Sequence, residues 1–112
     1  MDSRVKELWC SALESNEYEQ CEGRLKKDNR YCCLGVLTEL YTKEHPDDHE
    51  TKLNLATGTS LNKEVSSWSG IESFAADFSK MVNGKPTNFS LMQENDWGTS
   101  FRDIAVLIRK HF

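Results

Sequence analysis

The sequence contains few residues that interrupt regular structure, and it has no long apolar run. Among 112 residues there are two prolines and six glycines, with 38% hydrophobic and 29% charged residues. This composition excludes a wholly disordered or low-complexity chain. No apolar segment is long enough to span a bilayer, and the first residues have no secretion signal. We therefore expect one soluble globular domain over residues 1–112, with a core of its own.

Positive charge is also scarce. Fourteen lysines and arginines stand against eighteen aspartates and glutamates, so that the formal net charge is -4. A dedicated duplex-DNA binder normally carries a basic excess. The charge balance therefore disfavours duplex nucleic acid as a partner, while the acidic excess is too small to indicate a mimic of DNA.

Catalytic and metal-binding signatures are missing. The chain has no GxSxG, P-loop, GxGxxG or HExxH motif, and no CxxC pair. His45 and His49 have the spacing of two ligands on one helical face, but Pro46 between them interrupts such a helix. We predict that this acidic stretch is a solvated loop, and that the protein has no metal site and no cofactor.

The four cysteines are Cys10, Cys21, Cys32 and Cys33. Because nothing indicates secretion, we predict reduced thiols that are mostly buried as small apolar side chains. The alternative is that Cys32, at the start of a predicted helix, is a reactive thiolate whose pKa the helix lowers. A nucleophile of this kind would make the protein a small enzyme using Cys32, or else a site built from a histidine and a carboxylate.

Apolar spacing predicts four short helices. Three of them cover residues 3–15, residues 62–69 and a segment that begins at Ser100. The central helix begins at Cys33, and Gly35 inside it indicates a close approach by another part of the chain, since glycine costs about 1 kcal/mol there. Ser90 caps a further short helical turn. The apolar residues of segment 14–22 follow no regular spacing, so we expect this segment to be a connection without regular structure.

Turn residues predict the β structure. Asp28-Asn29 would join Leu25-Lys26 to Arg30-Tyr31, and Asn83-Gly84 would join two strands between residues 78 and 89. A helix from Ser73 to Met81 is the alternative to the first of these two strands. The alternation around Leu53 and Leu55 suggests a further short strand. The predicted fold class is therefore α+β, with about four short helices packed on one or two short β-hairpins.

Several strings in this order resemble a family of small phage and prophage proteins of unknown function. They are WCSAL (9–13), YEQ (18–20), YCCLGVL (31–37), WSG (68–70) and NDWGTSFRDIA (95–105). The resemblance implies a phage protein that acts in the cytoplasm of the host cell, and it implies no particular chemistry. Small phage proteins of this type often act by binding a host component, which is an argument by association.

One short segment concentrates basic residues. Arg24, Lys26, Lys27 and Arg30 fall within seven residues, offset by one aspartate. Such groups at a hairpin can hold a phosphate, and neighbouring aromatic rings can stack on a base. An ordinary solvated turn is the competing interpretation. The rings that would stack or anchor a partner are Tyr18, Tyr31 and Trp97.

These features lead to a hypothesis about function. We expect a non-enzymatic phage protein that antagonises a host system, such as anti-phage defence. It would do so by binding a host protein or by sequestering an anionic nucleotide signal at the basic turn. The alternatives are the small enzyme described above and a structural protein that self-associates into homo-oligomers through exposed aromatic side chains.

Overall fold

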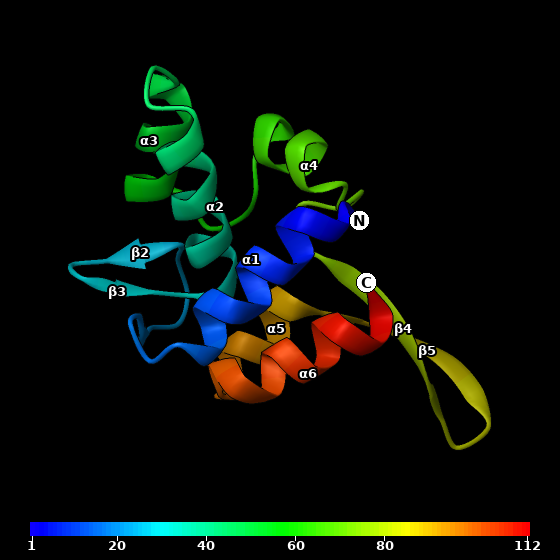
Figure 1. Ribbon diagram of the computed structural model, residues 1–112. Helices are drawn as coiled ribbons and strands as arrows, with labels where there is room; N and C mark the ends of the chain where they lie inside the picture. The colour runs from blue at the N-terminus through cyan, green and yellow to red at the C-terminus, as the bar shows by residue number, and fades with distance from the viewer.

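A computed structural model describes all 112 residues and shows an α+β fold, as predicted (Figure 1). The helices are α1 (Ser3–Glu14), α2 (Cys33–Glu44), α3 (His49–Thr57), α4 (Lys63–Ser69), α5 (Leu91–Asp96) and α6 (Phe101–His111). One sheet has the order β1-β3-β2, from β1 (Glu19–Gln20), β2 (Lys26–Lys27) and β3 (Arg30–Tyr31). The other is a hairpin of β4 (Asp77–Val82) and β5 (Lys85–Ser90). None of the helices has the length and apolar character that crossing a membrane requires.

The two terminal helices pack against each other in opposite directions at the centre of the molecule (Figure 1). Asp2 caps α1 by accepting a hydrogen bond from Val5 N at 2.9 Å. Each helix buries one face, because its apolar residues recur every three or four positions. The buried residues are Val5, Trp9, Cys10 and Leu13 on α1, and Phe101, Ile104, Ala105 and Ile108 on α6.

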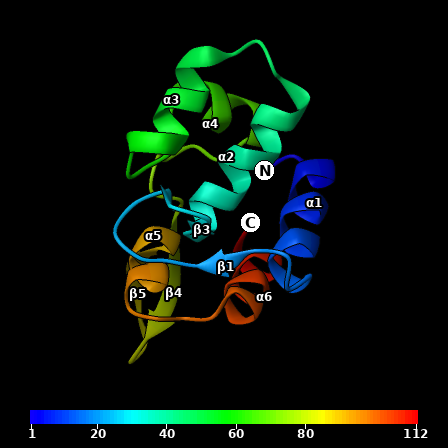
Figure 2. The ribbon, with the colours of Figure 1, turned by 90° about the vertical axis from the view of Figure 1, so that its left-hand side faces the viewer.

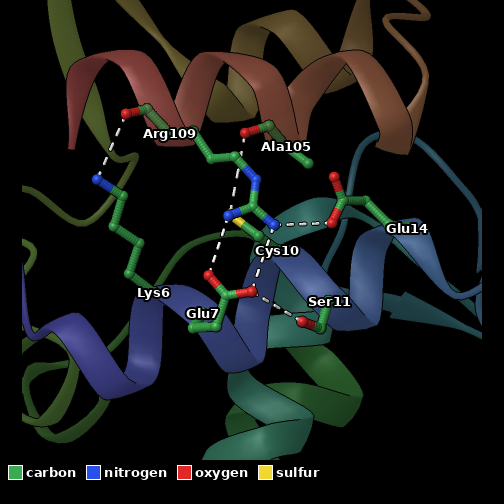
Figure 3. A network of polar contacts seen from close by, with 7 residues as sticks. All are labelled: Lys6, Glu7, Cys10, Ser11, Glu14, Ala105 and Arg109. Atoms are coloured by element: carbon green, nitrogen blue, oxygen red, sulfur yellow. Dashed lines mark hydrogen bonds and ion pairs between the residues drawn. The ribbon is translucent and has the colours of Figure 1, made fainter.

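Ion pairs tie the solvent side of this helix pair together (Figure 3). The Arg109 guanidinium on α6 lies 2.9 Å from a Glu7 oxygen and 2.8 Å from a Glu14 oxygen, both on α1. The hydrogen bond to Arg109 is the main reason that the pKa of Glu7 is lowered. The same contacts raise the pKa of Arg109.

The central helix α2 depends on one glycine. A Cβ atom on Gly35 would lie 1.8 Å from the carbonyl oxygen of Leu25. That oxygen accepts a hydrogen bond from Cys32 N at 3.0 Å, just before α2 begins. The close approach predicted from the sequence is therefore a backbone contact, which fixes the ribbon of β2 and β3 against the first turn of α2.

The second hairpin and the helix ends follow the predicted turn chemistry. Asn83 and Gly84 both have positive φ, as in the tight turns that join two strands. Gly70 ends α4 in the left-handed conformation, and α2 ends at Glu44, shortly before Pro46. Ser90 caps α5 by accepting from Gln93 N at 3.1 Å.

Two sequence interpretations are wrong. Leu53 and Leu55 lie in α3 and not in a strand, because Asp48 caps this helix through Thr51 N at 3.0 Å. Residues two apart on a helix point to nearly opposite sides, so Leu55 is buried while Leu53 is 63% exposed. Residues 14–22 are more than a connection, since they contain β1, which pairs in parallel with β3.

Replacing Gly35 with alanine should destabilise the protein by about 2 kcal/mol or more, because the new methyl group meets backbone that cannot rotate away. Denaturant unfolding measures this. The control is Gly84→Ala, where a Cβ would have nothing within 4 Å and only the positive φ is strained. An unchanged midpoint for Gly35→Ala would contradict the contact with Leu25.

The Glu7–Arg109 pair should make stability depend on pH. The folded pKa of Glu7 is lowered, so its contribution is complete above the unfolded value of about 4.3 and is lost as pH falls through the folded pKa. Thermal unfolding of the natural protein and of Arg109→Gln should differ at neutral pH. The difference should shrink below about pH 4. A difference that is constant with pH would show that the pair contributes nothing.

Candidate functional site

The predicted basic turn is the ribbon of β2 and β3. Lys26 pairs with Tyr31, and Lys27 pairs with Arg30. Directly opposed residues lie on the same face of a ribbon, and successive residues alternate between faces. Lys26 therefore shares one face with Tyr31, and Lys27 shares the other with Arg30. The fold divides the predicted cluster between two faces.

The face of Lys26 carries an aromatic pair. The rings of Tyr18 and Tyr31 meet edge to face with centroids 5.2 Å apart. The Lys26 Nζ lies 5.3 Å from the Tyr31 ring centre, and the Lys43 Nζ lies 5.8 Å from that of Tyr18. Tyr18 and Tyr31 are each half-buried. This face therefore has two stacking rings, each beside an ammonium group.

Lys43 is a member of this face that the sequence analysis missed. It lies in the last turn of α2 and donates a hydrogen bond to the Tyr18 hydroxyl at 3.2 Å. This hydrogen bond raises the pKa of Lys43. No sequence signal indicates it, because α2 brings it from 25 positions away.

The start of the basic turn borders a hollow of about 360 Å³ beside the end of α3. Its lining residues are Arg24, Lys26, Lys27, Asp28 and Ala56. Arg24 donates to the Ala56 carbonyl at 2.9 Å, and Leu25 N donates to the Gly58 carbonyl at 3.0 Å. The carbonyl end of a helix is its negative pole, so α3 itself attracts these cations. Three of the four predicted basic residues therefore line one hollow. Figure 2 shows α3 above β3 and β1 of the three-stranded sheet.

Two predicted site residues lie apart from this hollow. Arg30 is not among its lining residues and stands in register with Glu19 of β1. Trp97 follows α5, is 64% exposed and has no ring contact with Tyr18 or Tyr31. A hydrogen bond from Gly23 N to Asp96 at 2.9 Å nevertheless places the turn of Trp97 beside the start of the basic turn.

The cysteines are all free and buried, as predicted. Cys32 caps α2, its sulfur accepting from Gly35 N at 3.4 Å. Burial raises the pKa of Cys32 to about 11 and that of Cys33 well above its ordinary value. Desolvation therefore outweighs any effect of the helix end, and both groups stay protonated thiols at neutral pH.

The histidine and carboxylate groups near Pro46 serve as packing and capping groups. The His45 ring stacks on Tyr41 with centroids 4.1 Å apart. Asp48 accepts from the Tyr41 hydroxyl at 2.7 Å while it caps α3. His49 is exposed as the first residue of α3, so the predicted loop is confined to residues 45–48 between α2 and α3. No group of three or more histidine, cysteine, aspartate or glutamate side chains is placed to hold a metal ion.

Asn95 connects the elements that carry the candidate site. Its side chain is completely buried. The amide oxygen accepts from Cys33 N at 3.0 Å and from the Gln20 amide at 2.9 Å, and the amide nitrogen donates to the Cys21 carbonyl at 2.8 Å. One side chain thus joins α5, the start of α2 and the end of β1.

A family model described as a domain of unknown function matches residues 1–112, the whole of the chain. The chain belongs to the family DUF8296. No curated protein and no solved structure matches the chain. Membership of DUF8296 agrees with the predicted family of unknown function.

Substituting Asn95 with leucine should destabilise this DUF8296 protein by about 2–4 kcal/mol, because the buried Cys33 N–H and Cys21 carbonyl lose their partner. The Gln20 amide keeps its hydrogen bond to the Thr99 carbonyl. The matched control is Gln93→Leu on the exposed side of the same helix, which should change stability by about 0.5 kcal/mol or less. Denaturant unfolding followed by circular dichroism measures both. Equal effects of the two substitutions would contradict the role of Asn95.

Proposed function

We propose that this DUF8296 protein is a binding protein without catalytic chemistry, and that it takes an anionic ligand of nucleotide type at the basic turn. The observation that carries the proposal is the hollow of about 360 Å³ lined by Arg24, Lys26 and Lys27. Its volume is in the range of small-ligand sites. The three cations stand against one carboxylate, that of Asp28.

The neighbouring aromatic face supports a nucleotide in preference to a simple inorganic anion. Lys26 belongs both to the lining of the hollow and to the face of Tyr18 and Tyr31. A phosphate beside Lys26 of β2 would therefore lie next to Tyr31, its partner on β3, whose ring is one on which a base can stack. A long nucleic acid is disfavoured by the net charge of -4.

Binding is favoured over thiol catalysis by the cysteine environment. A nucleophile requires an accessible thiolate, whereas Cys32 is 2% exposed and its pKa is raised to about 11 by burial. The resemblance to phage proteins supports a setting in the host cytoplasm. There the protein would antagonise a host system by sequestering an anionic nucleotide signal or by occupying an acidic surface of a host protein.

Charge reversal at the turn tests this proposal. The variant K26E/K27E/R30E should weaken binding of nucleotides at least tenfold, because each new carboxylate repels phosphate. The probes are a nucleoside monophosphate, a nucleoside triphosphate and a cyclic dinucleotide, each titrated by calorimetry at fixed ionic strength. The control K63E/K85E/R102E changes the net charge by the same amount at exposed positions outside the hollow.

The outcomes separate the candidates. Nucleotide binding that is lost in K26E/K27E/R30E and kept in the control supports the proposal. Equal loss of nucleotide binding in both variants would show that overall charge, and not the basic turn, determines the affinity. If no probe binds the natural protein, the nucleotide-type ligand is wrong and the acidic host protein becomes the remaining candidate. Circular dichroism should show the same fold in all three proteins, since the changed side chains lie outside the hydrophobic core.

A further inference from the structure

The hairpin of β4 and β5 projects from the helical body, with its turn away from every helix (Figure 1). The residues near its turn are a mixture of polar and apolar types, and the side chain of Met81 is 66% exposed. A two-stranded hairpin has two free edges, and an open edge is a template for a further strand. The two edges of this hairpin differ in how well they are blocked.

The register decides which backbone groups point outward. The two-residue turn makes Val82 and Lys85 a hydrogen-bonded pair, so the groups of every second residue of β4 point away from β5. The hydrogen bond from Leu91 N to the Ala76 carbonyl at 3.0 Å continues the same alternation. Ser79 and Met81 therefore present free N–H and C=O groups along the outer edge of β4.

The outer edge of β5 is blocked. Pro86 stands opposite Met81, at a position whose N–H would point outward, and proline has none. Nearer the body, α5 packs against β5. The outer edge of β4 has no proline, and its first outward N–H, that of Asp77, is already bonded to the Ser73 hydroxyl at 2.6 Å.

A hollow of about 520 Å³ runs beside this open edge. It is lined by Asp77, Phe78 and Ser79 of β4 and by no residue of β5, so it lies on the outer side of β4. The opposite wall is the segment 70–73, and the end of α6 completes it. A strand added to β4 would place alternate side chains at this hollow.

The charge of the hollow indicates which side chain it accepts. Glu72 and Asp77 line it, and neither forms an ion pair. Lys80 is directed elsewhere, 3.7 Å from Glu94 and over the Phe89 ring. Burial, Lys110 and Lys80 lower the pKa of His111, so its ring adds no positive charge to the lining at neutral pH.

We propose that the outer edge of β4 binds an extended segment of a partner protein as an added strand, with a lysine or arginine side chain of that segment held beside Glu72 and Asp77. Backbone hydrogen bonds to Ser79 and Met81 hold the added strand. The exposed Met81 side chain is covered by it. This surface is separate from the cationic hollow and does not depend on the proposed function.

Nuclear magnetic resonance with synthetic peptides tests the proposal on the full chain. The probe is a capped peptide, Thr-Val-Thr-Lys-Thr-Val-Thr, and its partner probe has glutamate in place of lysine. The lysine peptide should shift the amide signals of Ser79 and Met81 in a saturable way and slow their hydrogen exchange. The glutamate peptide should bind about fivefold more weakly, as expected for an exposed charge pair.

Two proline variants at the same level of the hairpin provide the matched control. Ser79 and Asn88 are cross-strand partners, and both N–H groups point outward. Ser79→Pro should abolish binding of the lysine peptide, whereas Asn88→Pro should leave it unchanged. The double variant E72Q/D77N removes the two carboxylates and leaves the backbone edge of β4 intact, so it should bind both peptides equally. This test stays valid even if Ser79→Pro disturbs the hairpin of β4 and β5.

Several results would overturn the proposal. They are shifts at Asn88 in place of Ser79, equal affinity of the natural protein for both peptides, and no binding of either peptide at millimolar concentration. Shifts of Ser79 and Met81 that depend on protein concentration without peptide would show that a second copy of the chain occupies the edge, which also contradicts a basic partner.

Discussion

The fold depends on how the buried start of α2 satisfies its backbone groups. The first N–H groups of any helix have no partner within the helix, and leaving them unpaired away from water is costly. Here the Asn95 oxygen accepts from Cys33 N, and the Cys32 sulfur accepts from Gly35 N. Both acceptors are side chains that are themselves buried. The start of α2 can therefore be buried only when α5 has docked beside it.

The same junction determines where the candidate ligand surface lies. The Leu25 carbonyl accepts from Cys32 N and occupies the space left by the missing side chain of Gly35. The basic turn is thereby attached directly to the most buried helix of the protein. Lys27 is exposed and Lys26 half-buried, and the ribbon that carries them is attached to the core. A ligand that contacts this ribbon meets a preformed backbone.

Local sequence signals predicted those parts of the fold that depend on neighbours in the chain. The helix caps, the break before Pro46, the turn at Asn83-Gly84 and the need for Gly35 are all effects of a few adjacent residues. In α3 the same reasoning failed. Leu53 is exposed, and the residue one turn before Leu55 on the buried face is the polar Thr51. Leu55 was therefore the only apolar residue to mark a helical face, and spacing alone suggested a strand.

The parts of the candidate site that were not predicted depend on contacts between distant segments. Lys43 contacts Tyr18 only because the fold brings the last turn of α2 to the residue just before β1, and Asn95 meets Gln20 across 75 positions of sequence. The sequence grouped Arg24, Lys26, Lys27 and Arg30 by proximity, but strand alternation separates Lys27 and Arg30 from the aromatic face. Composition predicts a cationic cluster, whereas register determines which cations can reach one ligand.

The two small sheets stand at opposite ends of the helical body, β2 and β3 at one and the arm of β4 and β5 at the other (Figure 1). The hollows beside them also differ in charge. The hollow beside β2 is lined mainly by cations, and the hollow beside β4 is lined by the unpaired carboxylates of Glu72 and Asp77. An anionic ligand and a basic strand would therefore not compete for space or for charge. Because one packed core carries both sheets, the two proposed partners would occupy separate surfaces of the same body.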